Sequence, residues 1–167
     1  MYDELTEVDI AKMQEEIEYR TNVLRPEIID DVKTAREFGD LSENFEYKSA
    51  KREKNRNDSR IRYLEKMIKT AKVISGESKS DVVGLFDKVG VYFEDDEEAQ
   101  TIQIVTTLRQ NALKGLISKE SPVGKAIMGH RVGDRVCVEV NPDYSYFVVI
   151  RSIEKGRDDD SLPISAY

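Results

Sequence analysis

Residues with redox-active or metal-binding side chains are scarce in this chain. Of its 167 residues, one is cysteine and one is histidine. Because Cys137 is alone, an intramolecular disulfide is impossible, and a zinc site built on cysteines is disfavoured. A catalytic triad would need the single His130, and no Gly-x-Ser-x-Gly elbow accompanies it. The composition therefore argues against thiol, zinc and triad chemistry.

Long apolar runs are also missing. No stretch approaches the roughly 18 to 20 apolar residues that a membrane helix requires, and the first residues lack the basic and apolar regions of a signal peptide. We therefore expect a cytoplasmic protein without a membrane partner. Hydrophobic residues make up 39% of the chain and charged residues 35%, a mixture that allows a modest core beside much solvated surface.

Positive charge is in deficit overall, since the formal net charge is -7. A protein that wraps free nucleic acid would carry a basic footprint. The charges are unevenly distributed, however. Residues 3–43 hold 13 acids and 5 bases, whereas residues 48–72 hold 10 bases and 3 acids. These two segments are electrostatic complements.

Both segments show the apolar spacing of amphipathic helices. In the first, apolar residues recur at intervals of three, four or seven, at Ile10, Met13, Ile17, Leu24, Ile28, Val32 and Ala35. In the second, a similar stripe is formed by Tyr47, Ala50, Ile61, Leu64, Ile68 and Ala71. Pro26 removes a backbone hydrogen bond and clashes with the preceding turn, so we expect a kink or short break near Leu24.

Gly39 lies between the two helical segments, where a residue free to adopt positive φ can end a helix tightly. We therefore expect an antiparallel coiled-coil hairpin over residues 1–75, with its tip near residues 36–47. Arms of about 30 residues at 1.5 Å rise would extend on the order of 45 Å.

The basic residues of the second arm have two interpretations. They include Lys48, Lys51, Arg52, Lys54 and Arg56. The first interpretation is that they pair with acids of the first arm across the seam, which pattern alone favours. The second is that some remain unpaired and face a phosphate backbone.

A second domain is expected at residues 81–155, after a linker of small polar residues at 76–80. Four short strands of a mostly antiparallel sheet are predicted at residues 88–93, 101–108, 135–140 and 146–153. Ser121 followed by Pro122 predicts the start of a short helix among them.

Two segments of the second domain, and the end of the chain, have simpler interpretations. The acidic residues 94–98 are interpreted as a solvated hairpin loop rather than a metal loop. Gly124-Lys125 does not form a phosphate loop, because Lys119 and Ala126 stand where such a loop needs Gly and Ser or Thr. Residues 156–167 are expected to form an acidic, flexible tail.

Two carboxylates, Asp40 and Glu43, stand at the expected hairpin tip. Asp40 as N-cap with Glu43 three residues later matches a capping box, and pattern alone favours that structural interpretation. The functional interpretation is that the pair offers hard oxygen ligands to Mg²⁺. Since two carboxylates cannot complete a magnesium site, another macromolecule would have to supply the remaining ligands.

The residues at the tip resemble a known family. Gly39-Asp40-Leu41-Ser42-Glu43-Asn44, followed by Glu46-Tyr47, is similar to the signature of bacterial Gre transcript-cleavage factors, GreA more than GreB. The resemblance continues at Leu24–Ile29 in the first arm and at Ser118–Val136 in the second domain. It covers the chain from about Leu5 to Ile153.

This resemblance implies an α+β fold, with an N-terminal antiparallel coiled coil and a C-terminal FKBP-like domain that docks on RNA polymerase beside its secondary channel. In the family, the acids matching Asp40 and Glu43 help the polymerase hold a catalytic Mg²⁺ and an attacking water, so that backtracked RNA is hydrolysed near its 3′ end. The metal would be shared with the polymerase, and the isolated protein would bind none. The chain would be a monomeric accessory factor and not an enzyme.

The same match assigns further residues. Leu41, Asn44 and Tyr47 would support the tip. Arg36 and Arg52 are candidates to contact phosphates of the nascent RNA. The candidates for docking on the polymerase are Ser121, Pro122, Gly124 and Lys125.

Several positions depart from the family pattern. Phe45 stands where the family usually has alanine, residues 109–111 replace a more acidic segment, residues 141–144 replace a glycine-containing turn, and the last dozen residues extend past the usual end. These departures motivate a second hypothesis, a regulator of the same fold that occupies the channel without promoting cleavage. A third, a prolyl isomerase or chaperone, rests on fold alone, and fold does not carry an active site with it.

Overall fold

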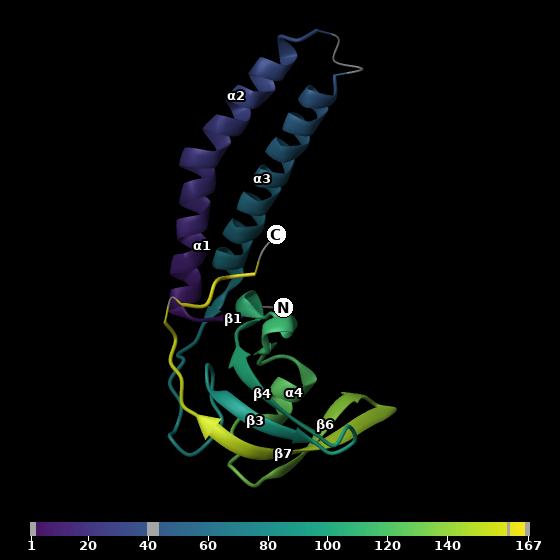
Figure 1. Cartoon of the computed structure of the whole chain (residues 1–167). Coiled ribbons are helices and arrows are strands. Elements are labelled where there is room, and N and C mark those ends of the chain that lie inside the picture. The colour runs from purple at the N-terminus through teal and green to yellow at the C-terminus, as the bar shows by residue number, and fades with distance from the viewer. Residues whose placement is uncertain (1–2, 40–43, 160, 166–167) are drawn as a thin grey trace. The chain divides into compact units, whose positions relative to one another are not determined.

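The computed structural model describes residues 3–39, 44–159 and 161–165 (Figure 1). The chain divides into two compact units. The helical unit spans residues 10–71, and the sheet unit joins the start of the chain, up to residue 9, to residues 72–166. Within the described ranges, no helix is long and apolar enough to cross a membrane.

The first arm of the helical unit is α1 (Glu7–Tyr19), a π-helical segment (Arg20–Leu24) and α2 (Arg25–Arg36). The Arg25 N–H donates to the Arg20 carbonyl oxygen, five residues earlier, as π-helical geometry requires. Pro26 then stands in the first turn of α2, directly after the π-helical segment, and its missing N–H removes one backbone hydrogen bond from the arm. The predicted break near Leu24 is confirmed, and it takes the form of a π-helical insertion.

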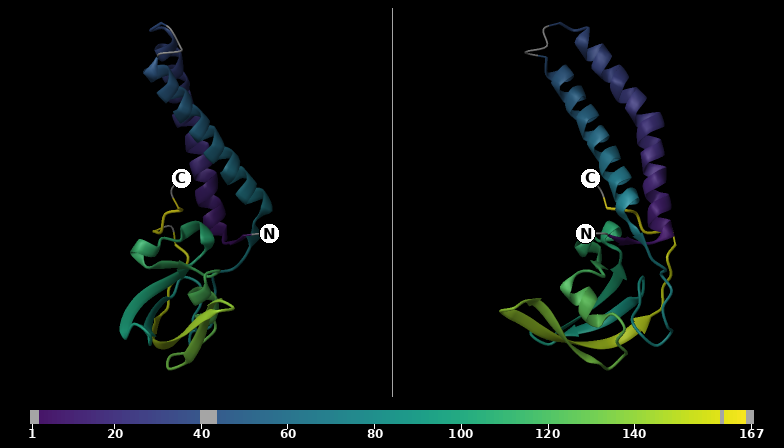
Figure 2. Two further views of the ribbon diagram at one scale, coloured as in Figure 1. Left: turned by 90° about the vertical axis from the view of Figure 1, so that its right-hand side faces the viewer. Right: turned by 180° about the vertical axis from the view of Figure 1, so that it is seen from behind.

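The second arm is one helix, α3 (Phe45–Thr70), which contacts both α2 and the π-helical segment. Figure 2 shows the arms side by side from two further directions. The apolar side chains Ile28 and Ala35 of α2 and Ile61 and Leu64 of α3 are buried. The predicted antiparallel hairpin is therefore confirmed.

A polar network lies in the middle of the contact between the two arms. In α3 the apolar stripe is interrupted there, between Ala50 and Ile61. Arg60 Nε donates to Glu16 Oε2 at 2.7 Å, and Arg20 Nη1 donates to Asn57 Oδ1 at 2.9 Å. Burial acts most strongly on the pKa of Glu16 and raises it, but hydrogen bonds and charge from Arg60 and Arg20 together outweigh burial and lower that pKa. Charge pairing across the seam is thus present at Arg60 and Glu16, although Arg60 is not among the basic residues named for it from the sequence.

The sheet unit contains a five-stranded sheet in the order β5-β4-β3-β7-β6. Its strands are β3 (Lys88–Phe93), β4 (Glu98–Val105), β5 (Leu116–Ser118), β6 (Arg135–Asn141) and β7 (Tyr144–Glu154). All neighbours pair antiparallel except β4 and β5, which are parallel. The four predicted strands and the α+β class are confirmed, while the short β5 was not predicted.

Shorter elements complete the sheet unit. Helix α4 (Pro122–Ile127) buries Ile127 in the core, and two 3-10 turns lie at Thr107–Arg109 and Ala112–Lys114. The predicted hairpin loop after β3 is a turn, and its Glu94 pairs with Arg135 of β6 at 2.8 Å. Strands β1 (Glu4–Leu5) and β2 (Lys72–Val73) form a separate parallel pair, which groups residues 3–9 with the sheet.

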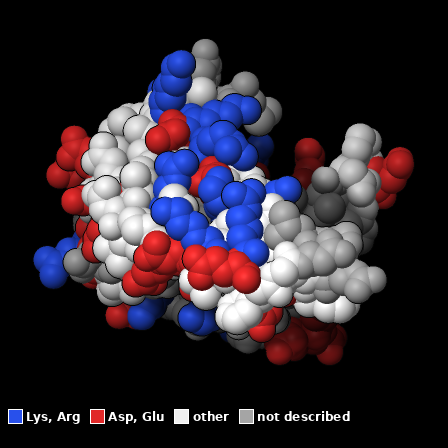
Figure 3. All heavy atoms as spheres, turned by 90° about the horizontal axis from the view of Figure 1, so that it is seen from above, with Lys and Arg blue, Asp and Glu red and all other residues white. Residues whose placement is uncertain are grey.

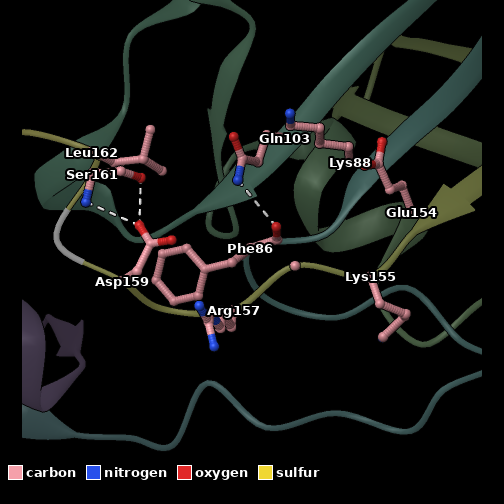
Figure 4. A pocket seen from close by; sticks show the side chains of 10 residues that line it. Phe86, Lys88, Gln103, Glu154, Lys155, Arg157, Asp159, Ser161 and Leu162 are labelled. Atoms are coloured by element: carbon pink, nitrogen blue, oxygen red, sulfur yellow. Dashed lines mark hydrogen bonds between the residues drawn. The ribbon is translucent and has the colours of Figure 1, made fainter.

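The C-terminal segment lies against the sheet unit in its described part. The Gly156 N–H donates to Asp87 Oδ1 at 2.9 Å, and the Ser165 N–H donates to the Leu108 carbonyl oxygen at 2.6 Å. Leu162 packs against the core. The segment also walls a pocket of about 290 Å³, in which Gln103 donates to the Phe86 carbonyl oxygen (Figure 4). Sequence reasoning treated this segment as a flexible tail and missed these contacts.

Arg109 is the largest fully buried side chain among the described residues. Its Nε lies 2.6 Å from Asp9 Oδ1, and its Nη2 lies 2.7 Å from Asp158 Oδ1. Nη1 donates to the Asp159 carbonyl oxygen at 3.2 Å, and the guanidinium carbon lies 5.1 Å from the centre of the Phe86 ring. One guanidinium thus links three segments of the sheet unit that are distant in sequence.

Candidate functional site: the hairpin tip

The tip is bounded by the end of α2 and the start of α3. Helix α2 ends at Arg36, with Glu37 as its C-cap. Gly39 follows with φ of +119°, a conformation that L residues with a side chain rarely adopt, so the predicted glycine turn is confirmed. Asp40, Leu41 and Glu43 lie outside the described residues.

Asn44 caps the second arm. Its backbone is extended, and its Oδ1 accepts a hydrogen bond from the Tyr47 N–H at 3.0 Å, as an N-cap does. Because α3 begins at Phe45, after both acids, the capping box predicted at Asp40 and Glu43 is wrong for this helix. The structural explanation that pattern alone favoured for the two acids therefore no longer applies to α3.

Asn44 also joins the two arms. Its Nδ2 donates to the carbonyl oxygen of Ala35, in the last turn of α2, at 2.6 Å. A single amide side chain thus satisfies an orphan donor at the start of α3 and adds a second donor to a carbonyl oxygen in the last turn of α2. This geometry agrees with a supporting role for Asn44 at the tip.

We expect Asn44→Ala to lower the free energy of local opening around Tyr47 by about 2 kcal/mol, since both a helix cap and an inter-arm hydrogen bond are lost. Hydrogen exchange of the Tyr47 and Lys48 amides measures this opening. Asn44→Asp is the matched control, because it keeps the capping oxygen but puts an acceptor in place of the donor to Ala35, so its loss of about 1 kcal/mol falls on the inter-arm bond. Unchanged exchange in Asn44→Ala would contradict the bridging role.

Tyr47 lies among cations at the start of α3. The Arg36 guanidinium carbon is 5.5 Å from the centre of the Tyr47 ring, and Lys51 Nζ is 6.0 Å from it. Hydrogen bonding by Arg36 lowers the pKa of the Tyr47 phenol, against the opposing effect of burial, and the charge of Lys51 adds to the lowering. Two residues predicted separately, Arg36 and Tyr47, are therefore in contact across the turn.

The basic residues of α3 do not follow the first interpretation alone, since one of them pairs within its own helix and others are exposed near the tip. Lys54 pairs with Asp58 at 3.2 Å, within the helix. Nearer the tip, Lys48 and Arg52 are exposed and form no ion pair with a residue that the structure describes. Figure 3, which views the molecule from the top of Figure 1, shows Lys and Arg side chains gathered in a band. Cations at the tip end of α3 are thus available to a partner.

The docking candidates in the sheet unit separate into structural and exposed residues. Ser121 Oγ accepts from the Gly124 N–H at 3.0 Å and caps α4. A Cβ on Gly124 would lie 2.2 Å from the Ser118 carbonyl oxygen, so only glycine fits there. Pro122 and Lys125 are exposed. Of the four candidates, these two present their side chains to solvent.

Metal ligands do not gather elsewhere in the part of the chain that the structure describes. No three or more His, Cys, Asp or Glu side chains come together there as a metal site. Asp40 and Glu43 lie outside that part of the chain. A magnesium ion prefers oxygen ligands and keeps several waters, so the donor chemistry of these two carboxylates suits a shared ion.

Comparisons with known proteins agree with these features. The family model for the N-terminal part of transcription elongation factors (GreA_GreB_N) matches residues 4–73. The model for the C-terminal part of transcription elongation factors GreA/GreB matches residues 77–155.

Individual relatives match over most of their length. A protein named transcription elongation factor GreA from Thermoanaerobacter pseudethanolicus is 45% identical over 137 residues, which is 81% of this chain and 87% of the relative. A protein of the same name from Bacillus licheniformis is 40% identical over 136 residues, or 81% and 86% of the two chains. One from Oenococcus oeni is 37% identical over 154 residues, or 92% and 95%.

Proposed function

This chain belongs to the GreA/GreB family of transcription elongation factors, and on that basis we propose that it stimulates the cleavage of backtracked RNA by RNA polymerase. It binds the polymerase at its secondary channel, in the cytoplasm and as a monomer, and the polymerase carries out the hydrolysis. The observation that supports this most is the intact signature from Gly39 to Asn44 at the end of the hairpin, where the predicted capping box does not account for the acids.

Asp40 and Glu43 contribute negative charge and hard oxygen atoms to the reacting centre of the complex. Magnesium, when bound by these carboxylates and by ligands of the polymerase, lowers the pKa of a bound water and so supplies the nucleophile. Asn44 and Gly39 fix the ends of the segment that carries the acids. The chain therefore places two carboxylates, and the polymerase provides the rest of the site.

The cations near the tip act on the RNA. Arg36, Lys48 and Arg52 carry positive charge toward the phosphates of the displaced 3′ segment, where each neutralised phosphate releases condensed counterions. In the sheet unit, Pro122 and Lys125 contact the polymerase. The two units thus have different roles. The sheet unit binds the polymerase, and the hairpin contacts the RNA.

A second function is favoured by one observation. Phe45 replaces the usual alanine next to the acids, and its side chain is 85% exposed. A ring of that size at the tip would hinder entry into a narrow site, and the chain would then occupy the channel as a regulator without promoting cleavage.

A backtracked elongation complex carrying 3′-labelled RNA separates the two functions. With Mg²⁺ present, saturating protein should release short labelled fragments at least about 100-fold faster than the polymerase alone, which is the lower end of the acceleration by a positioned catalytic group. A competition assay against a labelled copy of the protein shows whether it is bound. Binding without faster cleavage would overturn the cleavage function and support the channel-binding regulator.

A further inference from the structure

Two phenylalanines flank the hairpin tip with their rings in solvent. Phe38 is 72% exposed and Phe45 is 85% exposed. Neither ring contributes to the buried seam of the hairpin, so neither is explained by packing within the described residues. Single exposed apolar side chains are ordinary, but two aromatic rings at the same end of one hairpin indicate a contact surface.

One acceptor bonds both the backbone of Phe38 and the side chain of the residue before Phe45. The Phe38 N–H donates to the Ala35 carbonyl oxygen at 3.3 Å, and Asn44 Nδ2 donates to the same oxygen at 2.6 Å. Phe45 directly follows Asn44 and begins α3. Phe38 and Phe45 therefore lie at the same end of the hairpin, and in sequence they stand before and after residues 40–43.

Cations are interleaved with the aromatic residues at this end. Arg36 and Lys51 lie over the Tyr47 ring at 5.5 and 6.0 Å from its centre, and Lys48 is exposed. Aromatic side chains alternating with cations are typical of sites for single-stranded nucleic acid, where rings stack on bases and cations meet phosphates. The exposed acids Glu37 and Glu46 limit the positive charge, which favours contact with one or two nucleotides over a long backbone track.

We propose that Phe38 and Phe45 form a stacking site for an unpaired nucleobase at the 3′ end of the RNA. This inference rests on the proposed function, because the hairpin must reach the RNA. Both residues are positioning residues, which hold the terminal nucleotide beside the acidic segment and leave the hydrolysis to the metal and the polymerase. Since every base has a π face, the site accepts any terminal base.

The test places the fluorescent base 2-aminopurine at the 3′ end of the RNA in a backtracked complex, with Mg²⁺ withheld so that the RNA stays intact. Stacking on the tip should quench the fluorescence with wild-type protein and with Phe45→Tyr. Phe45→Ala and Phe38→Ala should each lose much of this quenching. Phe45→Leu keeps the apolar bulk without a π face and should behave like Phe45→Ala. Tyr19→Ala, on the exposed face of α1, is the matched control and should quench like wild type.

Cleavage supplies the second readout. With Mg²⁺ restored, Phe45→Ala should raise the half-saturating protein concentration about tenfold, within the range for removing one base-stacking ring, and change the maximal rate less. If Phe45→Leu keeps full cleavage activity and full quenching, apolar bulk suffices and a π face is not needed. The ring would then pack against protein, and the proposed stacking site would be overturned. Wild-type quenching by both alanine variants would overturn it too. Neither result affects the proposed function, which fails only if the wild-type protein does not accelerate cleavage.

Discussion

Replacing Asp40 by asparagine should lower the rate of stimulated RNA cleavage at least about 100-fold. Mutating groups that only hydrogen-bond to a metal ligand already costs up to about 100-fold in activity, and a direct ligand should matter at least as much. Asparagine keeps the size and hydrogen-bonding capacity of the side chain but removes the negative charge that a hard cation prefers. Glu43→Gln should have an effect of the same order. Single-turnover cleavage at saturating protein is the measurement, and raised Mg²⁺ should restore part of the rate.

Two controls make this prediction specific. Glu46→Gln removes the same charge from an exposed acid in the first turn of α3 and should leave the rate unchanged. Thermal stability should also stay unchanged in Asp40→Asn, because the N-cap of α3 is Asn44 and not Asp40. If Asp40→Asn is bound and cleaves RNA at the wild-type rate, the carboxylate has no part in the reaction.

Replacing Arg109 by alanine should destabilise the sheet unit by about 3–5 kcal/mol, the usual cost of breaking a buried ion pair. The side chains of Arg109 and Asp9 are both fully buried, at 0% exposure, so the substitution leaves an unpaired carboxylate away from water. The Asp158 carboxylate and the Asp159 carbonyl oxygen lose the same partner. Urea unfolding followed by circular dichroism measures the change.

A double-mutant cycle tests the physical cause. Adding Asp9→Asn to Arg109→Met should recover much of the stability, because replacing a buried pair by neutral groups costs less than orphaning one charge. Arg135→Ala, which breaks the exposed pair with Glu94, should change stability little by comparison. Equal effects for Arg109→Ala and Arg135→Ala would show that burial of the guanidinium is unimportant.

Much of the fold could be predicted from the sequence, because the signals are local. The three- and four-residue apolar spacing predicts the arms, Pro26 predicts the irregularity before α2, and Gly39 predicts the turn. Ser121 and Pro122 predict the start of α4 in the same way. In each case the decisive chemistry lies within a few residues of the feature.

The predictions that failed are of two kinds. Some contacts join residues that are far apart in the sequence, and at the tip two nearby residues could each serve as the helix cap. Arg109 carries a charge and is expected at the surface, and its partners Asp9 and Asp158 lie far away along the chain. At the tip, Asp40 and Asn44 both match an N-cap, and pattern alone cannot decide between them. The bond from Asn44 to Ala35, which decides in favour of Asn44, exists only after the arms have paired.

The parallel pair of β1 and β2 has a consequence for the order of folding. Glu4 pairs with Lys72, 68 residues later, and closing so long a flexible loop costs about 4 kcal/mol in entropy. The Lys72 N–H donates to Asp3 and the Ile74 N–H to Leu5, and two such bonds return only about 2 kcal/mol.

The ladder therefore forms only when the paired helices have already returned the chain to its start, since one residue separates β1 from α1 and one separates α3 from β2. Hydrogen exchange at the Lys72 amide should accordingly speed up in any variant that opens the arms. A faster hairpin opening with no change at Lys72 would show that the ladder holds by itself.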